Sequence, residues 1–320
     1  MPGGERWRHA AGQKMPVAHS RTTTTATSAA ARTAQSAGDR RCWRNGLKPI
    51  GPEVWSAAMP ETLETLELDE ADGVLTVTLN RPERKNAING AMWTELLATF
   101  RDAAVEPAVR VVVVTGAGGA FCSGADLSPG GGRDVEKHQL TRMRDVADVC
   151  LALHHLPKPV IAKVGGVAAG AGCNLALGCD LIVASEEARF SEIFARRGLT
   201  IDFGGSWVLP RLVGLHKAKE LALLADIISA QEAERLGIVN RVVPAAELDA
   251  FVADWAARLA AGPPLALSMT KKLLNDSLAM SLDQALEAEG MAQTVNFGTA
   301  DTAEAMAAFM EKRDPKFSGR

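Results

Sequence analysis

The sequence predicts an α/β protein with mostly parallel strand pairing, followed by a helical C-terminal subdomain. Two short β-branched runs, 110–115 (RVVVVT) and 159–164 (PVIAKV), are typical of strands that are buried on both faces of a sheet. Segments with helical spacing separate the strands, and from Gly205 onward the pattern is helical nearly throughout. Strands that alternate with helices favour parallel pairing, and the helical tail favours a separate α-subdomain.

Each element has its own local signal. Residues 73–79 (GVLTVTL) alternate as a strand does and end at a turn over 80–82 (NRP). Apolar residues then recur with helical spacing over 88–104, and Asn89 is the expected N-cap of that helix. Further along we expect a helix over 135–153, a short helix from about Ala171 and a strand over 180–184.

Composition changes near Met59, where we expect the compact domain to begin. Residues 1–58 carry nine Lys and Arg against three acidic residues, a net charge of +6, which leaves −9 for the remainder of a chain whose net charge is −3. The run 21–38 has almost nothing large and apolar to bury, so it is predicted to be disordered, although an organelle transit peptide has a similar composition. The predicted organisation is a disordered extension over 1–58, a core over 59–257 and a helical subdomain over 258–320.

Composition also argues against several classes of function. An acidic net charge does not suit a protein that binds nucleic acid through a basic surface. No stretch approaches the roughly 18 apolar residues of a membrane span. Five cysteines without a CxxC pair argue against a disulfide framework or a metal site and favour the reducing cytoplasm. We therefore expect no metal, no nucleic acid and no membrane as partners.

Two glycine-rich turns, 116–126 (GAGGAFCSGAD) and 165–174 (GGVAAGAGCN), each follow a predicted buried strand directly. Such turns present backbone N–H groups without obstruction by side chains, and a following helix adds partial positive charge, which suits an oxyanion. Glycines can also serve only to permit tight turns and close packing. Neither turn has the GK[ST] of a phosphate-binding P-loop or a proper GxGxxG pattern.

Five ordered segments together resemble the crotonase (enoyl-CoA hydratase/isomerase) superfamily over nearly all of 59–317. The resemblance implies a spiral of ββα units with a C-terminal α-helical trimerisation subdomain, in trimers that commonly pair as hexamers. It also implies an acyl-CoA thioester as substrate, with no cofactor beyond the coenzyme A of that substrate. The matching segments are 79–90 (LNRPERKNAING), 112–127 (VVVTGAGGAFCSGADL), 158–185, 198–214 (GLTIDFGGSWVLPRLVG) and 305–317 (AMAAFMEKRDPKF).

The same resemblance implies the site residues. The N–H groups of Ala125 and Ala171 would form the oxyanion hole, and Asp126 would hold its turn by hydrogen bonds. Phe309 and Lys312 would cover the adenine end of CoA, often from a neighbouring subunit; the alternative is an amphipathic terminal helix with a solvated lysine. The residues expected to border the substrate or CoA are Lys85, Asn86, Ala87, Ser123, Gly124, Asp126, Leu127, Gly170, Asn174, Phe194, Phe309 and Lys312.

Departures from the family pattern bear on the reaction. Asn174 and Phe194 occupy the positions of the two glutamates that hydratases of this family use, and neither can exchange a proton near neutral pH. Asp202 matches the place of a catalytic aspartate in dienoyl-CoA isomerases and aromatic acyl-CoA members; its alternative role is to cap the helix that begins near Gly204. Glu192 is two residues out of register, so we expect a surface or structural role for it.

The leading hypothesis is therefore isomerisation of an enoyl-CoA double bond, with Asp202 as the acid and base. The alternatives are hydration through Asp202 or Glu192, and a non-catalytic acyl-CoA binder that keeps only the oxyanion hole. Among the remaining residues, Cys122 is expected to be a packing residue rather than a nucleophile. The last expectations are that residues 154–155 (HH) form a helix cap or a surface site, and that Phe194 and Trp207 belong to an apolar pocket wall.

Overall fold

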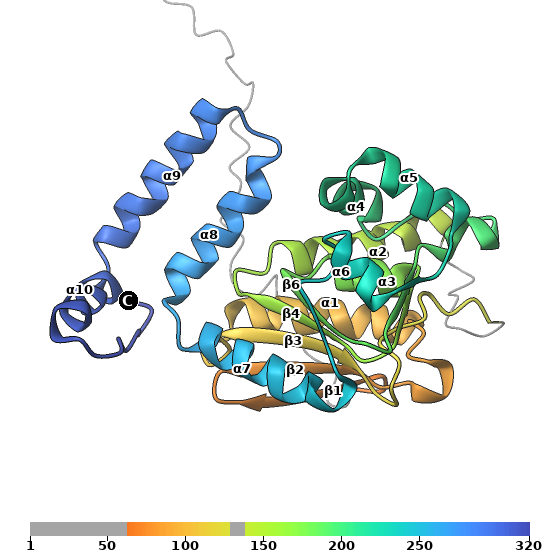
Figure 1. Cartoon of the computed structure of the whole chain (residues 1–320), viewed down its shortest axis with the longest axis horizontal. Coiled ribbons are helices and arrows are strands. Elements are labelled where there is room, and N and C mark those ends of the chain that lie inside the picture. Colours follow the sequence, from red (N-terminus) through yellow and green to blue (C-terminus); the bar gives the residue numbers. More distant parts are fainter. Residues whose placement is uncertain (1–62, 129–137) are drawn as a thin grey trace, which may run out of the picture. The chain divides into compact units, whose positions relative to one another are not determined.

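A six-stranded, mostly parallel sheet forms the centre of the computed structural model, which describes residues 63–128 and 138–320 (Figure 1). The strand order is β1-β2-β3-β4-β6-β9, in which only β1 and β2 pair antiparallel. A second sheet of three short strands has the order β5-β7-β8. The strands are β1 (Leu66–Ala71), β2 (Val74–Leu79), β3 (Val111–Gly116), β4 (Val160–Val164), β5 (Val167–Ala169), β6 (Leu181–Ser185), β7 (Arg189–Ser191), β8 (Ile228–Ser229) and β9 (Arg241–Val243).

The large sheet is buried on both faces, as its β-branched runs predicted. Val112 and Val114 of β3 belong to the main core cluster, which also contains residues of α1, α2 and α3. Val111 and Val113 point to the opposite face and pack in a second cluster with Leu248 of α7. The helices are α1 (Gly90–Val105), α2 (Gln139–His154), α3 (Ala171–Leu177), α4 (Gly205–Val213), α5 (Leu215–Leu224), α6 (Ala230–Arg235), α7 (Leu248–Ala260), α8 (Pro264–Ser277), α9 (Leu282–Phe297) and α10 (Ala300–Glu311).

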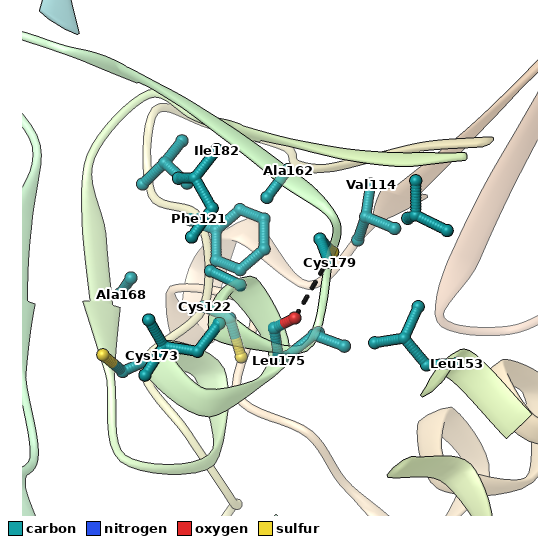
Figure 2. Packing of buried hydrophobic residues seen from close by; sticks show 14 of the residues in the cluster. Val114, Phe121, Cys122, Leu153, Ala162, Ala168, Cys173, Leu175, Cys179 and Ile182 are labelled. Carbon is teal, nitrogen blue, oxygen red and sulfur yellow. Dashed lines mark hydrogen bonds between the residues drawn. The ribbon is translucent and has the colours of Figure 1, made fainter. Parts of the chain in front are cut away.

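The main core packs side chains from neighbouring strands against α3 (Figure 2). Val114, Ala162 and Ile182 come from β3, β4 and β6, and all three are almost completely buried. The Cys179 thiol donates a hydrogen bond to the carbonyl of Leu175 at 3.4 Å, so this cysteine is a packing residue at the end of α3. The core therefore anchors α3 beneath the end of the sheet from which the second glycine-rich turn emerges.

Most predicted elements are confirmed, and most of the strands that were missed are short. Asn89 caps α1 as expected, because its side chain accepts a hydrogen bond from the Met92 N–H at 2.9 Å. The predicted helix over 135–153 is α2, although 135–137 lie outside the described residues, as does the whole predicted extension over 1–58. The sequence analysis did not anticipate β1, β5, β7, β8 or β9, of which all but β1 contain only two or three residues.

The C-terminal helices contact the core through polar groups. Lys271 of α8 makes an ion pair of 2.8 Å with Asp180, and the Asn275 amide donates to the carbonyl of His154 at 3.3 Å. Neither α8 nor α9 has a buried residue. The predicted boundary at 257/258 falls inside the last turn of α7, which continues to Ala260.

Candidate active site

The two glycine-rich turns lie against each other. Cys122 in the first turn and Ala168 in β5 form a parallel bridge, in which the Cys122 N–H donates to Val167 and the Ala169 N–H donates to Cys122, both at 2.9 Å. Gly172 in α3 packs directly on Cys122, since a methyl group on Gly172 would lie 2.3 Å from the Cys122 carbonyl oxygen. The absence of a side chain at Gly172 therefore lets the start of α3 approach the first turn.

This contact brings the two predicted oxyanion donors together. Gly124 has φ of 99°, a conformation that favours glycine, and a methyl group on it would lie 3.5 Å from the Ala171 nitrogen. Ala125 is exposed and Ala171 is buried, and neither N–H donates to another atom of the described chain. Two free backbone donors at neighbouring positions can bind the oxygen of a polarised carbonyl group.

A third segment, 85–88, runs alongside the first turn and holds it. The Ser123 N–H donates to Lys85 at 3.0 Å, and the Ile88 N–H donates to Gly124 at 2.8 Å. The Asn86 side chain is fully buried and donates to three carbonyl groups of 117–121, two of them at 2.9 Å. Its amide therefore builds the turn and is not accessible to a ligand. Of the remaining CoA candidates in this segment, Lys85 is exposed and Ala87 is buried.

Asp126 fixes its turn, as expected. Its carboxylate accepts hydrogen bonds from the Ser128 N–H at 3.0 Å and the Ser128 hydroxyl at 2.6 Å, and it pairs with Arg81 at 3.0 Å. The hydrogen bonds from Ser128, followed by Arg81, lower the pKa of Asp126 and keep it ionised. The sequence analysis missed Arg81, because a pair separated by 45 positions has no local signal.

Asp202 is not the helix cap that was its alternative role. Helix α4 begins at Gly205, its N-cap is Gly204, and no side chain caps it. The Asp202 Oδ1 atom is buried and has no hydrogen-bond partner within the described residues. Burial raises the pKa of Asp202 to about 6. A carboxyl group with a free oxygen and such a pKa can exchange a proton near neutral pH.

Asn174 connects Asp202 to Glu192. The Asn174 side chain is almost completely buried, and its Nδ2 donates to Glu192 Oε2 at 3.2 Å and to the Asp202 carbonyl oxygen at 3.0 Å. Glu192 is only 4% exposed, so of the two expected roles, surface or structural, the surface role is wrong. Burial raises the pKa of Glu192 to about 7, although hydrogen bonds from Asn174 and Cys173 oppose the shift. A 3-10 helix over Ile193–Arg197 begins directly after Glu192, and the sequence analysis did not predict it.

The aromatic candidates lie at different places. Phe194 is buried, and a methyl group on Gly170 would lie 3.7 Å from its ring, so Phe194 packs against the residue before Ala171. Trp207 instead packs its ring against His154, with centroids 5.4 Å apart, and beneath the Arg211 guanidinium. Neither ring contact of Trp207 involves Phe194, so these contacts do not join the two residues in one pocket wall.

The remaining candidate residues are a buried packing residue, a helix cap and three exposed side chains. Cys122 is fully buried, and burial raises its pKa to about 12, which suits a packing residue and not a nucleophile. His155 is the C-cap of α2, as expected. Leu127, Phe309 and Lys312 are exposed. Within 63–128 and 138–320, no group of acidic, histidine or cysteine side chains could hold a metal ion, and no helix is long and apolar enough to cross a membrane.

The mostly parallel sheet, the small second sheet and the C-terminal helices define a protein of the crotonase fold. The chain belongs to the enoyl-CoA hydratase/isomerase family, whose model matches residues 69–320. It is 40% identical over 256 residues to the "Probable enoyl-CoA hydratase" of Rhodobacter capsulatus, covering 80% of this chain and 98% of that one. It is 38% identical to the 1,2-epoxyphenylacetyl-CoA isomerase of Escherichia coli, covering 78% and 96%. The crystal structure of enoyl-CoA hydratase from Bacillus anthracis matches with a TM-score of 0.76 and 32% identity, over 80% of this chain and all of that one.

Proposed function

We propose that this protein moves the double bond of an enoyl-CoA, with Asp202 as the proton carrier. The N–H groups of Ala125 and Ala171 would hold the thioester oxygen while Asp202 removes a proton from one carbon and returns it to another. Negative charge builds on that oxygen in the dienolate, and preorganised donors stabilise it. Substrate and product are isomers, so the reaction needs no cofactor beyond the CoA of the substrate.

The free Oδ1 of Asp202, in a carboxyl group whose pKa is raised to about 6, is the observation that carries this proposal. A proton shuttle needs one group that can both accept and release a proton, and a pKa near the working pH suits that task. Asn174 and Phe194, at the positions of the hydratase glutamates, offer no exchangeable proton near neutral pH. The relative from Escherichia coli named 1,2-epoxyphenylacetyl-CoA isomerase supports isomerisation of a CoA ester, although its name is that of an epoxide isomerase.

Hydration of a 2-enoyl-CoA is the second candidate. Most of the relatives are named as hydratases, among them the 2,3-dehydroadipyl-CoA hydratase of Escherichia coli, which is 37% identical. Adding water requires one group to activate the water and another to protonate carbon. Glu192, with a pKa of about 7, is a second buried carboxyl group in contact with the Asn174 amide that also binds Asp202.

Matched 2-enoyl-CoA and 3-enoyl-CoA esters separate the two reactions. The 3-hydroxyacyl product and the double-bond isomer are measured separately for the wild type and for Asp202→Asn. We expect isomerisation to be faster than hydration in the wild type and to fall by about 10²–10⁴-fold in the variant, the usual contribution of a general acid–base group. Efficient hydration that survives in Asp202→Asn would contradict both the reaction and the role of Asp202. A protein that binds CoA esters but turns over none would be the non-catalytic binder.

We further propose a homotrimer, or a dimer of trimers, assembled through the C-terminal helices. Large apolar side chains that a helix leaves exposed favour contact with another chain. The partner's α10 would then bring its own copies of Phe309 and Lys312 to the adenine end of CoA. The exposed apolar residues of α9 are Leu282, Leu286, Met291, Val295 and Phe297.

The four described cysteines are free thiols, which supports a location in the cytoplasm.

A further inference from the structure

The carboxyl group of Glu192 has no task in the proposed isomerisation, and its burial is energetically unfavourable. It is 4% exposed, and its hydrogen bonds come from Asn174 and Cys173 without a cation among the described residues. A buried carboxylate that lacks a cationic partner destabilises a fold, so neutral packing would serve better if only packing mattered. One side of Glu192 borders a cavity of about 10 Å³, which is at the lower limit for a single water molecule.

The Asn174 amide links Glu192 to Asp202 by hydrogen bonds. Its Nδ2 donates both to Glu192 Oε2 and to the carbonyl oxygen of Asp202, which also accepts the Gly205 N–H at 3.0 Å. The amide is packed tightly, because a methyl group on Gly205 would lie 2.4 Å from Asn174 Nδ2 and Oδ1. The turn 202–205 therefore lies directly against the amide, and a rotation of the amide would move the turn.

That turn contains a residue in an unfavourable backbone conformation. Phe203 has φ of 46°, which is rare for a bulky residue that is not glycine. It is buried and stacks on Trp93 of α1, with ring centroids 5.6 Å apart. A backbone held in a sparsely populated region persists only where its surroundings restrain it. Trp93 restrains the turn from one side, and Asn174 restrains the neighbouring peptide group.

We propose that Glu192 is a positioning residue for Asp202: its carboxylate orients the Asn174 amide, which holds the Asp202 peptide and so directs the Asp202 side chain toward the substrate. This assignment rests on the proposed role of Asp202 as the proton carrier. The required feature of residue 192 is a hydrogen-bond acceptor and not its proton.

The test compares Glu192→Gln with Glu192→Leu in the full-length protein, with 3-hexenoyl-CoA as the substrate. Glutamine keeps an oxygen that can accept from Asn174, whereas leucine has a similar size and no acceptor. We expect Glu192→Leu to lower kcat by about 10- to 100-fold with little change in KM, since a small misplacement of a catalytic group has effects of this size. Glu192→Gln should keep most of the activity. In an Asp202→Asn background, Glu192→Leu should have no further effect, because both changes act on one group.

Deuterium uptake at the amides of 198–209 gives a readout that does not depend on the substrate. Glu192→Leu should raise it, Glu192→Gln should not, and Asn174→Leu, which breaks the same link from the other side, should raise it as well. Equal losses of kcat in the Gln and Leu variants, additive effects with Asp202→Asn, or unchanged deuterium uptake in both Glu192→Leu and Asn174→Leu would each overturn the proposal. Full activity in Asp202→Asn alone would instead refute the proposed function, while the uptake result would still decide whether Glu192 holds the turn.

Discussion

At the scale of single residues, burial and hydrogen bonding together determine which carboxyl groups of this protein can exchange protons near neutral pH. Asp126 and Asp202 are both aspartates in turns near the candidate site. Asp126 accepts several hydrogen bonds, and these lower its pKa. Asp202 accepts none at Oδ1, and its pKa is raised to about 6. The first carboxylate is held ionised as a structural anchor, and the second can act as a base near neutral pH.

The pH profile of isomerisation should report the ionisation of Asp202. Since the base form of Asp202 removes the proton, kcat/KM should be low in acid, rise with pH through about 6 and then level off. The measurement is an initial-rate profile from about pH 4.5 to 8.5 with a 3-enoyl-CoA ester. The residual activity of Asp202→Asn is the control, and it should lack this rise. A wild-type rate that does not change across this range would show that Asp202 is not the base.

Glu192 should make the folded protein less stable as the pH rises. Its folded pKa of about 7 lies above the ordinary value of 4.5, so the folded state binds its proton more tightly than the unfolded state does. This contribution favours folding in acid and is lost as the pH rises from about 4.5 to 7, at about 1.4 kcal/mol per unit of pKa difference. Thermal melts of wild type and Glu192→Gln at pH 5 and pH 8 test this. The variant should gain stability relative to wild type at pH 8, and an equal difference at both values would contradict the shift.

At the scale of elements, the start of α3 is where the second sheet, the core and the site meet. Ala171 is the first residue of α3 and follows Gly170, whose φ is 54°. Strand β5 leads directly into Gly170 and α3, and Gly172 allows the start of α3 to contact the first turn at Cys122. The proposed oxyanion hole would therefore be formed by two packed backbone segments, whose close contact requires small side chains.

Ala171→Pro should remove one donor without unfolding the protein. Proline lacks the N–H and is tolerated at the first position of a helix. We expect turnover to fall by at least about 100-fold, the usual effect of losing one oxyanion-hole donor. The matched control is Leu215→Pro, because Leu215 also begins a helix, α5, after a glycine N-cap with positive φ and is exposed. Activity near that of wild type in Ala171→Pro would mean that another group holds the thioester oxygen.

At the scale of the whole molecule, the C-terminal helices are attached to the core by few polar contacts and leave much apolar surface uncovered. The Lys271–Asp180 pair and the Asn275–His154 hydrogen bond connect α8 to the core, whereas α9 has no buried residue. Exposed apolar side chains of this kind favour contact with another chain, and this supports the proposed trimer.

Charge placed at exposed apolar positions of α9 should disrupt the assembly. Leu286 and Met291 are 55% and 62% exposed, so their replacement by glutamate does not disturb a monomer core. We expect Leu286→Glu with Met291→Glu to shift the mass measured by light scattering from that of a trimer toward that of a monomer. Glu287→Lys, a change at a charged position of the same helix, is the control and should leave the mass unchanged. A monomeric wild-type protein would contradict the proposed oligomer.

Residues 1–58 should be dispensable for the catalytic body. They carry the net positive charge and the low-complexity tract that set them apart in composition from the rest. A protein that begins at Met59 should therefore keep the melting temperature, the oligomeric mass and the turnover of the full chain. A large drop in melting temperature would show that the extension packs on the core.

The sequence alone determined the features that depend on neighbouring residues. The β-branched runs predicted β3 and β4 because a strand buried on both faces needs apolar side chains in both directions. Asn89 predicted the start of α1, and the glycines marked the two turns, because caps and positive φ angles are local requirements. The family pattern then indicated where to look for the site.

Only the tertiary structure decided what the polar residues do, because their properties depend on partners far away in the chain. A helix cap remained the alternative role of Asp202 until α4 proved to begin at Gly205 without a side-chain cap. Glu192 read as a surface or structural residue until its contact with Asn174, 18 positions away, placed it in the interior. Burial and hydrogen bonding set whether a carboxyl group holds its proton, and both arise only when α3, β7 and the start of α4 pack together.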